Sequence, residues 1–138
     1  MSSEKYQKQA QRWFSQAKMD IGAAQNSLHT KNFEWACFQA QQAGEKILKA
    51  VWLYYQHDPW GHSIFKLIKD FPEQEIYRKL LSQLEKEAQL LDKLYIPTRY
   101  PNGLPDLMPF EAYNEQDAAQ ALEAVNKIFT QIESHLNF

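Results

Sequence analysis

Proline is the residue that most constrains this chain, because it interrupts helices and is absent from long stretches of the sequence. It occurs only at positions 59, 72, 97, 101, 105 and 109. Glycine is scarce as well, with 4 in 138 residues. The prolines therefore divide the chain into blocks of helical length, and each block can be tested for helical periodicity.

The first two blocks have the periodicity of long helices. The first runs from Ser3, a plausible N-cap, to about His29, with apolar residues every three or four positions. The second starts after Asn32 and continues to about Gln56. It is apolar around most of its circumference, which is typical of a helix inside a bundle. Its narrow polar arc consists of Gln41, Gln42, Glu45, Lys46 and Lys49.

The rest of the chain predicts further helices and no strand. A turn at 57–61 precedes a short helix over about 63–70, and Pro72 opens a third long helix that reaches about Leu94. The last helix begins near Asn114, where Asp117 completes a capping box. The expected fold is all-α: one domain over 1–138, built as a four- to five-helix up-and-down bundle.

Residues 95–113 form the exception to this helical pattern. Four of the prolines lie here at four-residue intervals, which excludes a continuous helix. The segment is long for a loop in a compact domain, and such loops tend to be functional. Its many aromatic and aliphatic residues predict that it packs onto its own bundle, a ligand or a second subunit.

Composition excludes several classes of function. A net charge of −2 and a pI near 6.1 argue against a general nucleic-acid binder, so any such contact must be local. The single cysteine, Cys37, fits a reducing cytoplasm and lies on an apolar stripe, where burial makes a thiol inert. The four histidines have no metal-ligand spacing, no phosphate-loop motif is present, and no apolar run is long enough for a membrane span. We therefore expect no metal, cofactor or membrane contact.

The polar arc of the second block is the first candidate site. One interpretation is an ion pair within the helix, between Glu45 and Lys49. The other is that Lys46 or Lys49 faces a groove beside Gln42 and holds a phosphate. Both interpretations give a partner to polar groups that are costly to bury alone.

The loop motif at 95–101 is the second candidate site. Arg99 offers a planar fork of donors suited to phosphate, and Tyr95 and Tyr100 flank it as possible stacking partners for a base. The alternative is a packing loop in which Arg99 pairs with a carboxylate such as that of Asp92. The spacing alone does not choose between the two.

These two candidate sites together resemble a known family. The segment 41–50 resembles the Gln-Ala-x-Glu-Lys-x-x-Lys-Ala signature of HEPN domains, in which a histidine follows after a turn, here His62. The segment 94–101 resembles the Tyr-x-x-x-Arg-Tyr-Pro element of the same family. The resemblance implies a helical bundle that forms a homodimer and binds a nucleotide or RNA. It also implies a possible nucleotidyltransferase partner in a toxin–antitoxin-like pair.

Some HEPN proteins are metal-independent ribonucleases whose arginine is followed by histidine after four to six residues. None of the three arginines here is followed by a histidine at that spacing. Histidine is the side chain best suited to general acid–base cleavage of RNA, so the motif lacks the group that would carry out the cleavage. The resemblance therefore implies a non-catalytic binding module. Its expected ligand-binding residues are Arg99, Tyr100, Tyr95, Lys49, Lys46, Gln42 and His62. Two alternatives stay open: a ribonuclease that uses Arg99 and His62 at a dimer cleft, and a purely structural protein-interaction module.

Overall fold

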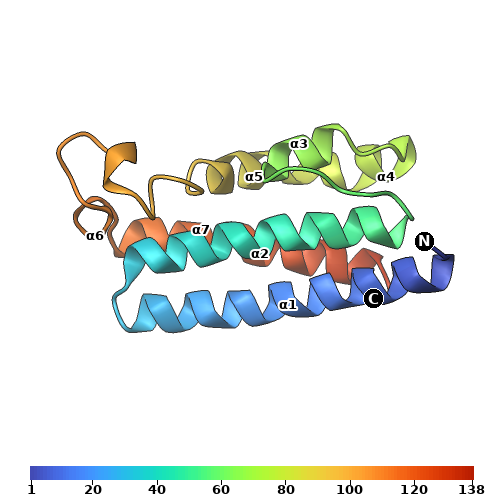
Figure 1. Cartoon of the computed structure of the whole chain (residues 1–138), viewed down its shortest axis with the longest axis horizontal. Helices are drawn as coiled ribbons and strands as arrows, with labels where there is room; N and C mark the ends of the chain where they lie inside the picture. Colours follow the sequence, from blue (N-terminus) through green and yellow to red (C-terminus); the bar gives the residue numbers. More distant parts are fainter.

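The computed structural model describes all residues, 1–138, and contains helices and turns but no strand. Three long helices lie side by side along the length of the molecule (Figure 1). They are α1 (Ser3–His29), α2 (Phe33–Tyr54) and α7 (Glu115–His135). The all-α bundle predicted from the sequence is confirmed. None of its helices combines the length and the apolar character needed to cross a membrane.

The fourth side of the bundle is a layer of short helices that covers α2 (Figure 1). In chain order these are α3 (Ile64–Lys69), α4 (Gln74–Lys79), the 3-10 turn η1 (Leu81–Leu84) and α5 (Glu85–Asp92). The prediction of a third long helix is therefore wrong, because this part of the chain forms α4, η1 and α5 instead of one continuous helix. Its backbone breaks at Leu80 (φ −124°, ψ −60°), and the break lets Leu80 and Leu81, which are adjacent in sequence, both be buried in the core.

The predicted ends of the long helices agree with the structure to within two residues. The cap of α1 is Ser2 rather than Ser3, since the Ser2 hydroxyl accepts a hydrogen bond from the amide of Lys5 at 3.2 Å. The capping box of α7 is confirmed: the Asp117 amide donates to Asn114 at 3.0 Å, and the Asn114 amide donates to Asp117 at 2.9 Å.

Helix α2 is the central helix, as predicted. It packs against α1, α7, α3 and α5, and its small residues let these neighbours approach closely. At Gly44 a side-chain carbon would lie 2.7 Å from the Cδ1 atom of Ile64. Cys37 lies fully buried on the same helix, where burial, helped by Asp117 and Glu34, raises the pKa of its thiol to about 12.

The proline-rich segment closes one end of the bundle with two short turns, η2 (Pro101–Gly103) and α6 (Pro109–Ala112). The segment doubles back on itself, so that Gly103 lies against Pro97. A side-chain carbon at Gly103 would lie 3.1 Å from the Cα atom of Pro97. The buried Thr98 hydroxyl donates to the carbonyl of Leu94 at 2.6 Å, which ties the start of the segment to the chain after α5.

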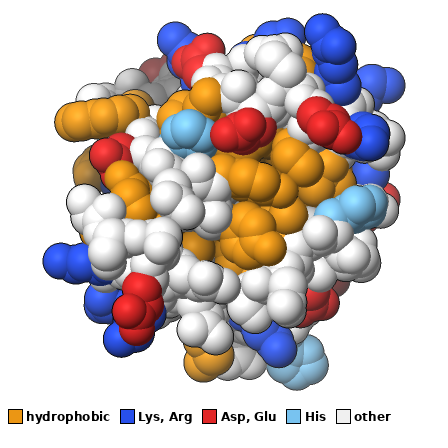
Figure 2. Space-filling view, turned by 90° about the vertical axis from the view of Figure 1, so that its right-hand side faces the viewer, with side chains coloured by type: hydrophobic (Ala, Val, Ile, Leu, Met, Phe, Trp, Pro, Cys, Tyr) orange, Lys and Arg blue, Asp and Glu red, His pale blue; other side chains and the backbone are white.

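The opposite end of the bundle carries the N-terminus and an aromatic cluster. Apolar side chains gather in the middle of this end face (Figure 2). Trp52, Tyr55 and Phe71 pack edge to face there, with ring centroids 5.6–5.9 Å apart in the contacts to Phe71. The two ends therefore differ: aromatic packing closes one of them, and the proline-rich segment closes the other.

Candidate functional site

Glu45 is the buried acid at the centre of the candidate site. Its side chain is only 6% exposed, and two partners compensate its charge. The Lys49 ammonium lies 3.2 Å from its carboxylate one turn along α2, which confirms the predicted ion pair. Nδ1 of His62 lies 3.2 Å from the other carboxylate oxygen. The Lys49 ammonium also lies 5.5 Å from the centre of the Trp13 ring on α1.

Gln41, a second buried polar residue of α2, fixes the backbone at the same place. Its side-chain amide donates to the carbonyl of His62 at 3.2 Å, and the amide of Gln42 donates to the Gln41 oxygen at 2.8 Å. Both the backbone and the ring of His62 are thus held by α2. The hydrogen bond from Gln42 helps to orient the Gln41 side chain.

Lys46 lies apart from this cluster, although it is on the same helix. Its ammonium forms an ion pair with Asp20 of α1, and its side chain lines a small groove with Trp13. Lys46 and Lys49 are therefore both neutralised by a carboxylate. The predicted contact of either ammonium with a phosphate stays a prediction.

Asp92, at the end of α5, caps the short helix α3. Its carboxylate accepts hydrogen bonds from the Ser63 hydroxyl at 2.6 Å and from the amides of Ile64 at 2.7 Å and Phe65 at 3.1 Å. The alternative in which Asp92 pairs with Arg99 is therefore wrong, because the acid is occupied by the N-terminus of α3. Through this cap, Ser63, which follows His62, is held next to Asp92, which lies shortly before Tyr95 in the sequence.

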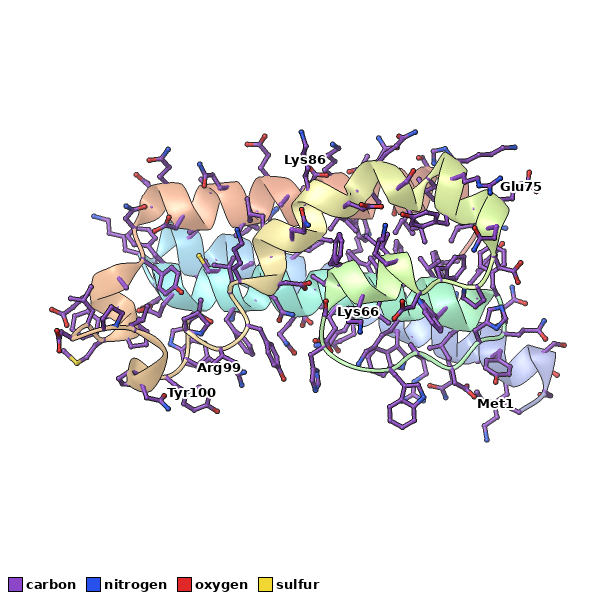
Figure 3. The ribbon with its side chains drawn as sticks, turned by 90° about the horizontal axis from the view of Figure 1, so that it is seen from above. Met1, Lys66, Glu75, Lys86, Arg99 and Tyr100 are labelled. Carbon is purple, nitrogen blue, oxygen red and sulfur yellow. The ribbon has the colours of Figure 1, made fainter.

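Arg99 lies among aromatic rings and has no carboxylate within ion-pair distance. Its guanidinium carbon is 4.4 Å from the ring centre of Phe38, 4.7 Å from that of Tyr95 and 5.0 Å from that of Tyr100. Its Nε–H donates to the carbonyl of Tyr95 at 3.0 Å. Seen from above, Arg99 and Tyr100 lie at the end of the molecule that carries the proline-rich segment, far from Met1 (Figure 3).

The ring of Tyr95 contacts both His62 and Arg99. The His62 ring stacks on it with 4.9 Å between centroids and 17° between planes, while Arg99 contacts the same ring. A continuous row of side chains thus runs over one face of the bundle. It consists of Lys49, Glu45, His62, Tyr95, Arg99 and Tyr100.

The structure brings together Arg99, Tyr95, Tyr100, His62 and Lys49 from the predicted set and leaves Lys46 outside. It adds Phe38 of α2, whose ring contacts the guanidinium and which is absent from the predicted set. One sequence signal does point to Phe38. It precedes Glu45 by seven residues and Lys49 by eleven, so the three share one face of a helix.

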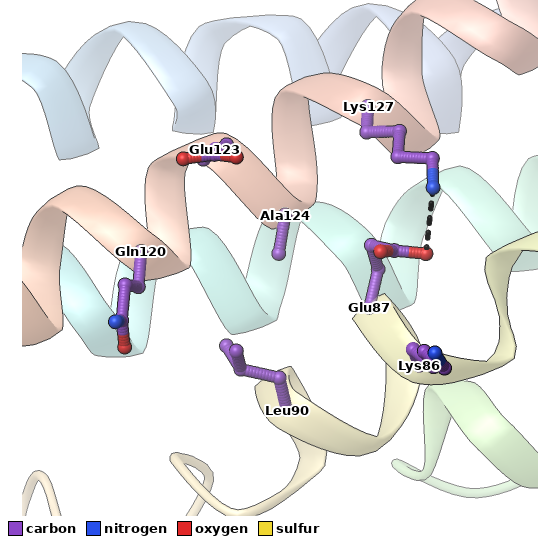
Figure 4. A pocket seen from close by; sticks show the side chains of 7 residues that line it. All are labelled: Lys86, Glu87, Leu90, Gln120, Glu123, Ala124 and Lys127. Carbon is purple, nitrogen blue, oxygen red and sulfur yellow. Dashed lines mark ion pairs between the residues drawn. The ribbon is translucent and has the colours of Figure 1, made fainter.

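A separate groove of about 330 Å³ lies between α5 and α7 (Figure 4). Lys127 reaches across it to within 3.4 Å of the Glu87 carboxylate. Lys86 and Glu123 also line it, so its charges are balanced.

No three His, Cys, Asp or Glu side chains in the chain are grouped in a way that could hold a metal ion.

The chain is thus a helical bundle in which the polar arc of the central helix holds His62 and the arginine–tyrosine loop lies beside that histidine. The HEPN family model, described as the HEPN domain, matches residues 10–135, and the chain belongs to this family.

Solved structures agree over nearly the whole chain. The crystal structure of TT1696 from Thermus thermophilus is 39% identical and covers 93% of this chain and 98% of its own, with a TM-score of 0.86. ST0689, an archaeal HEPN homologue, is 28% identical over 94% of this chain and 98% of its own, with a TM-score of 0.77. The HEPN domain protein TM0613 from Thermotoga maritima is 27% identical over 89% of this chain and 95% of its own, with a TM-score of 0.66.

A curated human protein, sacsin, also matches this chain. It is 26% identical over 134 residues, which are 93% of this chain. The chain spans about 3% of the length of sacsin, so the similarity concerns one segment of a much larger protein.

The Asp92 cap generates a prediction about stability. Replacing Asp92 with Ala removes three hydrogen bonds at the start of α3, two of them from backbone amides. We expect the free energy of unfolding to fall by about 2 kcal/mol, the usual size for losing a charged cap. Urea denaturation followed by circular dichroism measures this. Asp70→Ala is the matched control, because that exposed side chain makes no hydrogen bond. Equal stability of the two variants would contradict the capping role.

Proposed function

We propose that this HEPN protein is a binding module for a nucleotide or an RNA, and that Arg99 is the residue that holds the phosphate. The observation that supports the proposal is the environment of Arg99. It is the one cation of the row of side chains that no acid neutralises, whereas Lys49 is paired with Glu45. An unneutralised guanidinium at the surface is available to an anion.

The chemistry of the guanidinium suits a phosphate. Its Nε–H is already used by the Tyr95 carbonyl, which fixes the orientation of the group. Both terminal amino groups remain as donors, and they match two phosphate oxygens in a bidentate contact. Because the aromatic neighbours are weakly hydrated, the guanidinium loses less solvation on binding than a free surface cation would.

Tyr100 provides a surface for a base next to the phosphate, because its ring is exposed and contacts Arg99. The ring of Tyr95 is already stacked with His62 and in contact with Arg99, so it orients these two side chains. Base stacking on aromatic rings contributes about 1–3 kcal/mol per base and tolerates different bases. This arrangement fits a ligand with one phosphate and one base, in keeping with the weak net charge of the chain.

In this proposal Lys49 and Gln42 are positioning residues. Lys49 compensates Glu45, Glu45 holds the His62 ring, and Gln42 bonds the Gln41 side chain that holds the His62 backbone. Lys46 lies outside this row of side chains, paired with Asp20 of α1.

Calorimetric titration of ATP, GTP and short RNAs into the protein tests the proposal. We expect wild type to bind below the millimolar range. Arg99→Ala should weaken binding about 10- to 100-fold, the cost of losing a charged hydrogen-bond pair. Arg99→Lys should recover part of the loss, because it keeps the charge but not the fork. Arg78→Ala removes an exposed arginine of α4 and serves as the matched control. The proposal is wrong if wild type shows no binding, or if the Arg78 and Arg99 variants behave alike.

A ribonuclease is the second candidate, and one observation favours it. His62 and Arg99 both contact the ring of Tyr95 although they lie far apart in the sequence, so an arginine and a histidine share one site. The Glu45 carboxylate, 3.2 Å from Nδ1 of His62, would hold the imidazole ring in a fixed orientation during acid–base cleavage.

Incubation of labelled RNA with purified protein in EDTA tests this second candidate. If it is correct, cleavage should occur and should be lost in both His62→Ala and Arg99→Ala, while the Arg78→Ala control stays active. RNA that remains intact with wild type, or cleavage that is unaffected by both substitutions, would eliminate the ribonuclease.

A further inference from the structure

A groove on α1 continues the row of side chains beyond Lys49. The Lys49 ammonium lies 5.5 Å from the centre of the Trp13 ring, and Trp13 lines a groove of about 320 Å³ between α1 and α2. The other residues that line this α1 groove are Gln9, Arg12, Gln16 and Lys46. A series of side-chain contacts therefore leads from Arg99 at the loop end of the bundle to the α1 groove.

Arg12 gives the α1 groove its charge. Its side chain is exposed and makes no ion pair. The other cation of the groove, Lys46, is paired with Asp20 and adds no net charge. No acidic residue lines the groove itself. Arg12 is thus available to an anion, although no aromatic rings hold it as they hold Arg99.

A second hollow of about 440 Å³ on α1 adjoins the groove and shares Gln9 and Arg12 with it. Lys5 and Lys8 also line this hollow, and neither ammonium is paired with an acid. Glu4 is its only acidic residue. This face of α1 is therefore positively charged, although the chain as a whole has a net charge of −2, and it attracts anions.

The loop between α2 and α3 presents an exposed tryptophan beside this path. The loop runs back along the bundle from the end of α2 (Figure 1). Its Asp58 accepts a hydrogen bond from the hydroxyl of Tyr6 on α1 at 2.9 Å, and its His62 is held by α2. Tyr6 and Trp13 are seven residues apart and share one face of α1, so the loop borders the α1 groove. Trp60, midway between the two anchors, is 85% exposed and makes no hydrogen bond, so its ring is open to a stacking partner.

The distance between the two arginines sets the size of the ligand. Phe38, which contacts Arg99, and Lys49, which contacts Trp13, are eleven residues apart on α2. At about 1.5 Å per residue this is roughly 16 Å along the helix. Stacked nucleotides of one strand are about 3.4 Å apart, so the span corresponds to roughly five of them. A mononucleotide held at Arg99 therefore does not reach Arg12.

We propose that the ligand is a single-stranded oligonucleotide of about five or more nucleotides. Its first phosphate lies at Arg99, a base in its middle stacks on Trp60, and a later phosphate is bound by Arg12. This inference rests on the proposed function, because it extends the ligand of the Arg99 site. Cations that follow the backbone, together with exposed rings that stack on unpaired bases, are the two features of sites for single strands.

Displacement of a fluorescein-labelled adenylate octamer, followed by fluorescence anisotropy, tests the length of the ligand. The competitors are AMP and unlabelled adenylates of two, four, six and eight nucleotides. Affinity should rise with length, and the hexamer should bind at least about tenfold tighter than AMP, as expected for one further charged contact or stacked base. Arg99→Ala should weaken the binding of both.

Two variants should separate the hexamer from AMP. Arg12→Gln should weaken hexamer binding about tenfold and reduce the slope of log K against log salt by about 0.7, the effect of one phosphate contact to a single strand. Trp60→Leu should weaken it about 5- to 100-fold, whereas Trp60→Phe should keep most of the affinity. Both Arg12→Gln and Trp60→Leu should bind AMP like wild type. Because both residues are exposed, thermal unfolding should be unchanged in either variant.

The controls distinguish this inference from the proposed function. Arg78→Ala, on α4, should bind the hexamer like wild type. If AMP binding depends on Arg99 but the hexamer binds no tighter, or is insensitive to either Arg12→Gln or Trp60→Leu, the inference is wrong and the proposed function stands. AMP binding that is unaffected by Arg99→Ala would refute the proposed function instead. An abasic hexamer that binds as tightly as the adenylate hexamer would also overturn the inference, because the surface would then attract charge alone.

Discussion

Burial of polar side chains on the central helix is the constraint on which the rest of the site depends. Because α2 is covered on several sides, Gln41 and Glu45 lie in the interior, where an unpaired amide or carboxylate would cost several kcal/mol. Both are satisfied by the loop before α3. Gln41 bonds the backbone of His62, and Glu45 bonds its ring. The polar groups of the core thus fix a loop that has little secondary structure of its own.

The position of that loop sets the position of the next one. Asp92 joins the start of α3 to the end of α5, and the chain then leads directly to Tyr95. Tyr95 stacks on His62, and its carbonyl and ring orient Arg99. Arg99 is therefore placed by aromatic contacts, each worth about 0.5–2 kcal/mol, rather than by an acid. This leaves the charge of the arginine free, while the charges of Lys46 and Lys49 are used within the bundle.

Local features of the fold follow from the sequence, and tertiary ones do not. Periodicity and proline spacing predict the long helices, and the Asn114 capping box and the Glu45–Lys49 pair involve residues within one turn of each other. The break at Leu80 depends on how two adjacent leucines reach a shared core, which periodicity in one segment does not show. The sequence alone also left two acceptable partners for Arg99. Asp92 is excluded only because α3 folds back onto it.

In the proposed function, Arg99 alone among the arginines is held ready for a phosphate. Nuclear magnetic resonance of the side-chain Nε–H groups tests it most directly, because the chain has only three arginines, at positions 12, 78 and 99. On addition of AMP, the Arg99 signal should shift in a saturable way together with the ring signals of Tyr100, while Arg12 and Arg78 stay unchanged. Small, linear shifts shared by all three arginines would contradict the claim, since they would show only weak attraction of anions to surface charge.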